Sequence, residues 1–182
     1  MQILFGIIIE NFMIEKFYAV MKKTNIIINL FVVIFLLASC SGSKEARTYK
    51  KTIDGNWQLQ TIVTEGIMGK VKVQLFSEAD FNCFVGSSWH FNDYNSLGAY
   101  TISKNENECV GLKRNIRWSI YETKGEPKLL QFKRLDDKLK QTDEGDGFRF
   151  TIMQLDNNTM QLRSNITFEN KPASLIYNFV RI

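Results

Sequence analysis

The sequence is poor in the residues that most often build catalytic and metal sites. Its 182 residues contain one histidine, three cysteines and two prolines. The single histidine, His90, leaves a zinc site short of ligands and a serine triad with only one candidate base. No set of nucleophile, base and orienting group is visible. We therefore expect a protein that is not an enzyme, with no catalytic residues, no metal and no cofactor.

Basic residues are not concentrated anywhere along the chain. The 23 Lys and Arg residues are scattered among 19 Asp and Glu residues, which gives a formal net charge of +4. Nucleic-acid binding needs basic residues gathered on one face, so we expect no nucleic-acid partner. One acidic stretch lies between Leu135 and Gly147, but its spacing does not match a calcium loop, and a solvated hinge is the preferred interpretation. Its acidic residues are Asp136, Asp137, Asp143, Glu144 and Asp146.

No apolar run reaches the roughly 20 residues that cross a bilayer. The longest run, from Ile26 to Leu37, is broken only by Asn29, follows Met21-Lys22-Lys23 and leads into Leu37-Ala38-Ser39-Cys40. A basic start, an apolar middle and small residues at the end are typical of an export signal.

The residues Leu37-Ala38-Ser39-Cys40 resemble the lipobox of bacterial lipoproteins. The resemblance implies cleavage before Cys40, a diacylglyceryl group on its thiol and acylation of the new amino terminus. Several acyl chains anchor a protein stably. Because Ser41 and not Asp follows the cysteine, we expect a lipid-anchored protein of the cell envelope at the outer membrane. The alternative is an ordinary signal peptide with a chance cysteine.

Four regions follow from this pattern. Residues 1–20 are interpreted as a gene-start artefact ahead of a true start at Met21, or as part of a long amino-terminal region that precedes the apolar segment of the signal. Residues 21–39 form the signal peptide, and residues 40–53 form a lipidated tether. The tether is predicted to be flexible, since residues 41–52 are polar and lack periodicity. Residues 54–182 form a single folded domain.

The sequence of the folded domain predicts a succession of β-strands. Inward and outward residues alternate with a period of two, with many aromatic and β-branched side chains, in segments separated by Asn-, Asp- and Gly-containing turns. Short connections predict an all-β, antiparallel, up-and-down barrel of about eight strands. The predicted strands are 57–63, 87–91, 97–103, 114–122, 128–135, 147–155, 159–166 and 174–182. The segment from Val71 to Cys83 is ambiguous, and we expect a short strand or loop that runs into one or two helical turns.

Two cysteines remain after Cys40. An even pair in an exported protein is typically oxidised, so we expect a disulfide between Cys83 and Cys109. Such a loop would add about 3 kcal/mol to stability. The alternative is two separate buried thiols.

The motif Gly55-Asn56-Trp57 resembles the Gly-x-Trp start of lipocalins. In that family the tryptophan closes the barrel floor and an arginine from a late strand packs across it. Arg181 lies in the last predicted strand, on the inward parity of Leu175 and Phe179. The resemblance therefore implies a barrel-closing contact between Arg181 and Trp57.

Further residues resemble the lipocalin-like lipoproteins of bacterial envelopes, over roughly residues 54–182. They are Phe81-Asn82-Cys83, Ser88-Trp89-His90-Phe91, Gly98-Ala99-Tyr100, Cys109 and Trp118-Ser119. The resemblance implies a calycin-type barrel. His90, between Trp89 and Phe91, should point away from the interior.

Two functions from different classes remain open. The first is a membrane-anchored module that binds a small hydrophobic ligand inside the barrel. The second is an envelope structural or protein-interaction module with a filled barrel, whose protein partner is unknown. An apolar cavity of about 300 Å³ or more would favour the first. The candidate cavity-lining residues are Trp89, Phe91, Tyr100, Trp118, Phe132 and Phe150.

Overall fold

The computed structural model describes residues 43–67, 69, 72–105, 108–143, 145 and 147–182. The expected signal peptide at 21–39, its signal helix, the segment 1–20 and the lipidation site Cys40 lie outside these residues. The described residues belong to one compact unit, Ser43–Ile182.

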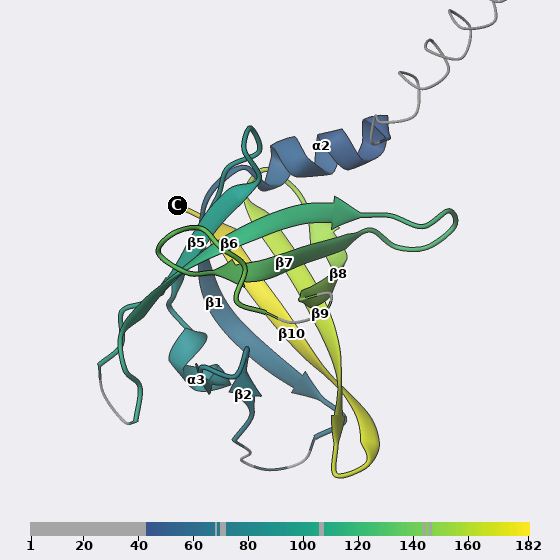
Figure 1. Cartoon of the computed structure of the whole chain (residues 1–182). Helices are drawn as coiled ribbons and strands as arrows, with labels where there is room; N and C mark the ends of the chain where they lie inside the picture. Colours follow the sequence, from purple (N-terminus) through teal and green to yellow (C-terminus); the bar gives the residue numbers. More distant parts are fainter. Residues whose placement is uncertain (1–42, 68, 70–71, 106–107, 144, 146) are drawn as a thin grey trace, which may run out of the picture. The chain divides into compact units, whose positions relative to one another are not determined.

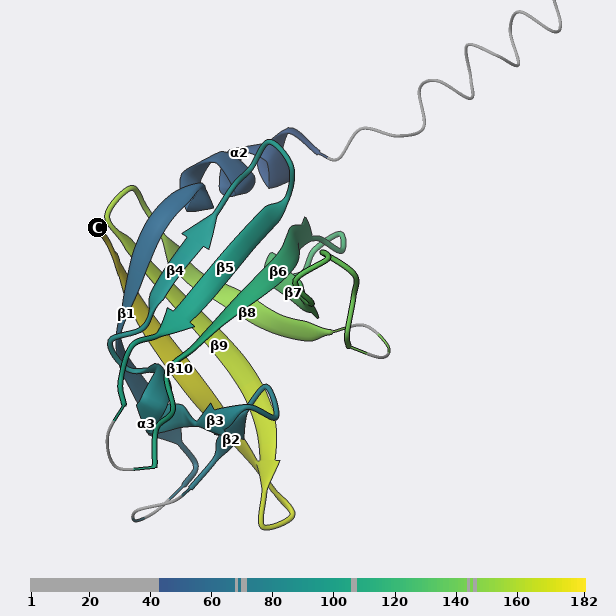
Figure 2. The same ribbon diagram turned by 60° about the vertical axis from the view of Figure 1, so that its left-hand side comes forward.

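Eight antiparallel strands close into a barrel in the order β1-β10-β9-β8-β7-β6-β5-β4, and β4 pairs with β1 to complete the ring (Figures 1 and 2). The predicted all-β barrel is confirmed. The strands are β1 (Gly55–Glu65), β4 (Ser88–Phe91), β5 (Leu97–Ile102), β6 (Leu112–Tyr121), β7 (Leu129–Leu135), β8 (Phe148–Leu155), β9 (Thr159–Phe168) and β10 (Lys171–Arg181).

The alternation of side chains explains why these segments form barrel strands. Along β10 the residues Ala173, Leu175, Tyr177 and Phe179 are buried, whereas the residues between them are partly exposed. Successive strand residues point to opposite faces, so every second side chain enters the barrel. Register shifts interrupt the ladders at Leu59/Thr61 and at Ile152/Gln154. Such irregularities increase local twist, which helps a sheet to curl.

Residues 44–53 form a helix, α2 (Lys44–Ile53), so the prediction of a flexible tether is wrong for this stretch. Ser43 caps the helix, since its Oγ accepts a hydrogen bond from the Ala46 amide at 3.0 Å. Glu45 in the first turn and Lys50 and Lys51 in the last turn suit the helix dipole. Only one residue of α2 is fully buried, Ile53, and this explains why no apolar period marked the helix. Within the described part of the chain, α2 included, no helix is long and apolar enough to cross a membrane.

The ambiguous segment contains a small insertion between β1 and β4. It consists of β2 (Gln74–Leu75), β3 (Ala79–Asp80) and the short helix α3 (Phe81–Phe84). The expected strand running into helical turns is confirmed for residues 74–84. Asp80 caps α3 through a hydrogen bond from the Asn82 amide to its Oδ1, at 3.0 Å. The insertion and α2 lie at opposite ends of the barrel in both ribbon views (Figures 1 and 2).

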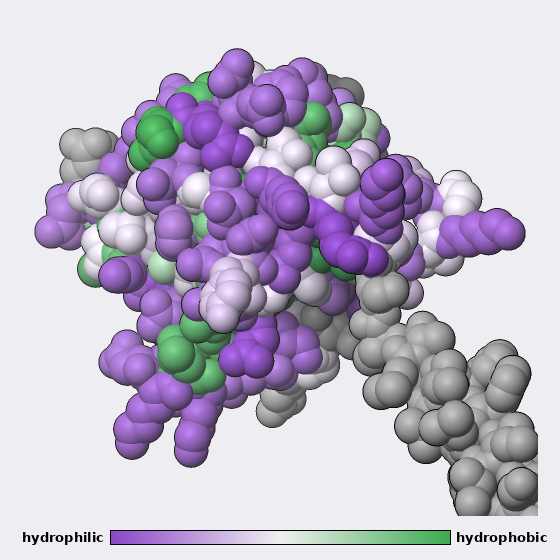
Figure 3. Space-filling model, turned by 90° about the horizontal axis from the view of Figure 1, so that it is seen from above, coloured by the Kyte–Doolittle hydropathy of each residue, from purple (hydrophilic) through white to green (hydrophobic). Residues whose placement is uncertain are grey.

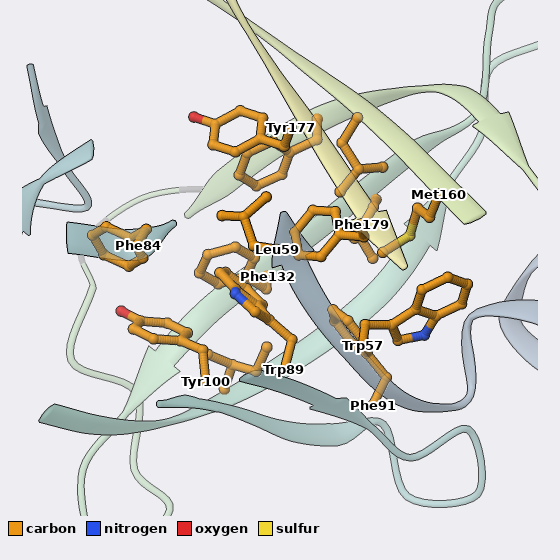
Figure 4. Packing of buried hydrophobic residues seen from close by; sticks show 14 of the residues in the cluster. Trp57, Leu59, Phe84, Trp89, Phe91, Tyr100, Phe132, Met160, Tyr177 and Phe179 are labelled. Atoms are coloured by element: carbon orange, nitrogen blue, oxygen red, sulfur yellow. The ribbon is translucent and has the colours of Figure 1, made fainter. Parts of the chain in front are cut away.

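The core fills the barrel from one end to the other. Figure 4 shows Trp89, Tyr100 and Phe132 turned toward one another, with Trp57 and Phe91 further along the interior. The ring centroids of Trp89 and Tyr100 are 4.7 Å apart, and those of Trp89 and Phe132 are 5.8 Å apart. Offset and edge-to-face arrangements at such distances are favourable for aromatic pairs.

Candidate functional site

The barrel has a closed end, at the start of β1, where the expected Arg181–Trp57 contact is confirmed. The guanidinium carbon of Arg181 lies 4.3 Å from the centre of the Trp57 ring. A Cβ placed on Gly55, whose φ is +116°, would come within 2.6 Å of the Arg181 guanidinium. Glycine is therefore needed at this position for two reasons, the backbone conformation and the space for the arginine.

Helix α2 is fastened to the same end. Arg181 donates hydrogen bonds to the carbonyl oxygens of Asp54, at 2.7 Å, and Thr52, while the indole Nε1 of Trp57 donates to Ile53 at 2.7 Å. The last carbonyls of a helix have no partner within it, and a cation there also suits the helix dipole. The Gly-x-Trp motif thus both seals the barrel and holds α2. The sequence indicated only the first of these roles.

All six candidate cavity-lining residues face the barrel interior, and each is at least 96% buried. The space that remains among the side chains is nevertheless only about 10 Å³. Trp89, Phe91 and Phe150 border this space, whereas Tyr100, Trp118 and Phe132 do not. As it stands, the interior is filled. The role of the six candidate residues in ligand binding stays a prediction.

One of the rings that fill the interior does not come from the barrel wall. Phe76 sits at the tip of the hairpin formed by β2, β3 and the turn between them (residues 74–80), which we call the finger hairpin. Its ring lies 4.8 Å from that of Phe148 and 5.2 Å from those of Phe84 and Phe132. It also contacts the rings of Trp89, Tyr100 and Phe150. Phe76 therefore closes the end of the barrel opposite α2, which we call the mouth.

The turn that carries Phe76 has a costly backbone. The Glu78 amide donates to the Leu75 carbonyl at 2.9 Å, and the two central residues, Phe76 and Ser77, have φ of 54° and 55°. Two positive φ values in succession are the mark of a type I′ turn, which normally uses Asn and Gly. A bulky residue in this region is an outlier, and the conformation costs about 1–3 kcal/mol. The packing of the Phe76 ring offsets that cost.

Polar groups gather beside the Phe76 ring in what we call the mouth cluster, composed of Glu78, Tyr100, Arg114, Arg134 and Asp143. Arg114 Nε lies 2.6 Å from Glu78 Oε1, and Arg134 Nη1 lies 3.4 Å from the same oxygen. The Tyr100 hydroxyl donates to Glu78 Oε2. Arg134 also pairs with Asp143, its Nη2 lying 2.5 Å from Asp143 Oδ1, and donates to the Phe76 carbonyl. The finger hairpin is thus held by its ring, its carboxylate and its backbone.

Burial governs the proton affinity of two tyrosines in the interior. Burial raises the pKa of Tyr100 well above its ordinary value of about 10, and the hydrogen bond to Glu78 raises it further. Burial also raises the pKa of Tyr177 to about 12, against the opposing effect of the hydrogen bond with Ser164. Both hydroxyls therefore stay protonated at neutral pH, and Tyr100 serves Glu78 as a hydrogen-bond donor.

The disulfide between Cys83 and Cys109 is confirmed, with the Cα atoms 5.4 Å apart. It joins α3, next to the mouth, to the connection between β5 and β6. His90 is exposed on the outer face, as expected, and its Nδ1 lies 2.9 Å from Asn56 Oδ1. Of the acidic stretch, Asp136 accepts hydrogen bonds from the amides of Lys138 and Lys140. Across the part of the chain that the structure describes, no three His, Cys, Asp or Glu residues are grouped as metal ligands.

Two open clefts lie on the outer surface of the described residues. One, of about 600 Å³, lies over β6 and β7 and includes Arg117, Gln131 and Leu139 in its lining. The other, of about 580 Å³, lies beside the disulfide and includes Lys72, Asp80 and Lys104. Hydrophilic residues dominate the face shown in Figure 3, where hydrophobic residues form small separate patches. These clefts are open and of mixed polarity, unlike an enclosed apolar ligand cavity.

Comparison with known proteins gives one family match. A family described as lipocalin-like domain matches residues 53–162. Two solved structures resemble the chain. One is bovine odorant-binding protein in complex with a selenium-containing odorant, with a TM-score of 0.39, 12% identity and coverage of 78% of each chain. The other is odorant-binding protein from bovine nasal mucosa, with a TM-score of 0.38, 11% identity and coverage of 79% of this chain and 77% of that chain. No curated protein matches significantly.

Proposed function

This chain belongs to the lipocalin-like domain family, and from that premise we propose that it binds a small apolar ligand inside its barrel. The observation that carries the proposal is the position of Phe76. Its ring fills the mouth from a hairpin outside the barrel wall, so the ring can leave without breaking the ladder of eight strands. The role is one of binding rather than catalysis.

Withdrawal of Phe76 would uncover a cavity lined by apolar and aromatic side chains. Trp89, Phe132, Phe148 and Phe150 all contact the Phe76 ring and would contact a ligand in its place. The finger hairpin is itself small, because β2 and β3 each comprise only two residues. A ligand would have to compete with the ring. Its apparent affinity would equal its affinity for the open form multiplied by the fraction of molecules that are open.

A fluorescent apolar probe tests this proposal. N-phenyl-1-naphthylamine would be titrated into the purified full-length protein and into Phe76→Ala, with Tyr94→Ala as the matched control, because the Tyr94 side chain is exposed. We expect Phe76→Ala to bind the probe at least tenfold more tightly than the wild type, and Tyr94→Ala to bind like the wild type. Absence of binding by both the wild type and Phe76→Ala would overturn the proposal.

The filled interior favours a second candidate, an envelope structural or interaction module whose barrel holds no ligand. A residual space of about 10 Å³ is far below the roughly 300 Å³ of an ordinary ligand cavity. On this reading the Phe76 ring is a permanent part of the core. The same titration separates the two candidates, since a permanent core predicts that Phe76→Ala loses stability and gains no probe binding.

We also propose that the protein is a lipoprotein of the cell envelope, anchored at the outer membrane through Cys40. The residues Leu37-Ala38-Ser39-Cys40 behind a basic and apolar segment support this. Only residues 41–43 would separate the anchor from α2, which begins at Lys44. Such a short link would keep the domain near the membrane surface.

Metabolic labelling tests the anchor. In a bacterial host given an alkynyl fatty acid, we expect the wild type and Ser41→Ala to be labelled and to sediment with the outer membrane. Cys40→Ser should lose the label and leave the membrane fraction. A Cys40→Ser protein that keeps its label would exclude Cys40 as the acylated residue.

A further inference from the structure

The mouth cluster contains a carboxylate that is unusually well buried and well partnered for a loop residue. The side chain of Glu78 is 6% exposed, and it is bound by Arg114, Arg134 and Tyr100. Burying a charge is costly unless its partners compensate for the lost water. Three donors from three barrel strands, β5, β6 and β7, therefore form a preformed site for one carboxylate at the barrel mouth.

Glu78 and Phe76 occupy the mouth as one unit. They lie two residues apart on the same turn, so the finger hairpin places an aromatic ring in the interior and a carboxylate at the entrance. Moving the hairpin outward would remove both groups together. It would leave an apolar cavity with two arginines and a tyrosine hydroxyl at its rim.

We propose that the ligand is an amphipathic monocarboxylate, with an apolar alkyl or aryl body, and that Phe76 and Glu78 hold its place in the empty protein. This inference rests on the proposed function and names the ligand class for the same site. The body takes the place of the Phe76 ring, and the carboxylate takes the place of the Glu78 carboxylate between Arg114 and Tyr100.

The charge of the mouth cluster supports a single negative charge on the ligand. With Glu78 in place, the two arginines are balanced by Glu78 and Asp143. Without Glu78 the same groups carry one excess positive charge. A neutral apolar ligand would leave Arg114 without this partner next to a dry cavity, whereas a carboxylate restores both the charge balance and the hydrogen bonds.

Two ligands that share a chain and differ in the head group test the inference. Decanoate and decan-1-ol would be titrated into the full-length protein, with tryptophan fluorescence as the readout because Trp89 lies beside Phe76. The variant Phe76→Ala/Glu78→Ala mimics the open site. We expect it to bind decanoate at least tenfold more tightly than decan-1-ol. Adding Arg114→Met should reduce that preference to less than threefold, whereas adding Lys113→Met, an exposed neighbour on β6, should leave it unchanged.

The outcomes separate this inference from the proposed function. If both ligands bind equally, the apolar site stands and the carboxylate site is wrong. If neither ligand binds and the naphthylamine probe also fails, both proposals fall. A measurement on the wild type guards against a misfolded variant. Decanoate should raise its melting temperature more than decan-1-ol does at equal concentration, and an equal or smaller shift overturns the carboxylate inference.

Discussion

The guanidinium of Arg181 lies over the ring of Trp57, 4.3 Å from its centre, and also binds the carbonyl oxygens of Thr52 and Asp54. One side chain therefore joins the last strand, the first strand and the end of α2. The Trp57 indole reinforces the junction by donating to Ile53. The closed end of the barrel depends on this pair more than on any surface ion pair of the described residues, because exposed pairs contribute little.

Replacing Arg181 by Met should destabilise the protein by about 2–3 kcal/mol. The variant keeps apolar contact with Trp57 but loses the cation and the hydrogen bonds to the carbonyls at the end of α2. Urea denaturation followed by tryptophan fluorescence measures the change. Arg117→Met, on the exposed outer face of β6, serves as control and should change stability by less than about 0.5 kcal/mol. Equal effects of the two substitutions would contradict the assigned role.

Removing the disulfide should cost about 3 kcal/mol, since the bridged residues are 26 positions apart and the bridge restricts the unfolded chain. The test is urea denaturation of Cys83→Ala/Cys109→Ala beside the wild type, each with and without a reducing agent. The wild type should lose stability on reduction, and the double variant should not respond. The wild type would also be unfolded and refolded in the presence of the reductant. If its free energy of unfolding did not change after this treatment, the result would count against the bridge.

Two buried tyrosines should make the folded protein resist ionisation at high pH. Because burial raises the pKa of Tyr177 to about 12 and raises that of Tyr100 as well, their contribution to stability is complete below about pH 10. It is lost as the pH rises through the folded-state pKa values. Absorbance at the tyrosinate band should therefore reach its plateau at higher pH in the native protein than in urea, and Tyr177→Phe should lose part of the late rise. Superimposable native and urea curves would refute this.

The local sequence pattern was enough to predict the barrel but not the finger hairpin that fills its mouth. Along the barrel strands, buried residues alternate with partly or fully exposed ones, and that period can be read without knowledge of the partners. The contact of Arg181 with Trp57 could be inferred because parity and a motif fixed both residues. Helix α2 was missed because its apolar face amounts to little more than Tyr49 and Ile53, so the local signals were limited to the Ser43 cap and the charges in its first and last turns.

The finger hairpin could not have been predicted from its residues. A two-residue turn with positive φ normally shows Asn-Gly or a similar pair, and Phe76-Ser77 gives no such signal. Its conformation is imposed by the ring contacts and by the pairing of Glu78 with Arg114. The pairing of Glu78 with Arg114 joins residues 36 positions apart in the sequence, a relationship that periodicity does not report.

Because φ at Phe76 is positive, we predict that glycine at this position gives a more stable protein than alanine, the reverse of the usual order. Both Phe76→Ala and Phe76→Gly should lose about 3 kcal/mol or more with the ring. Alanine would retain the strain of a left-handed backbone and glycine would not, so Phe76→Gly should be the more stable of the two by about 1 kcal/mol. Urea denaturation of both variants measures the difference.

Phe84, a buried phenylalanine in α3 without a positive φ, provides the matched pair of control substitutions. There alanine should be the more stable substitution, because glycine in a helix costs conformational entropy. A Phe76→Gly variant less stable than Phe76→Ala would mean that the turn does not hold Phe76 under strain. The proposal that the finger hairpin can leave the mouth would then lose the support of that strain.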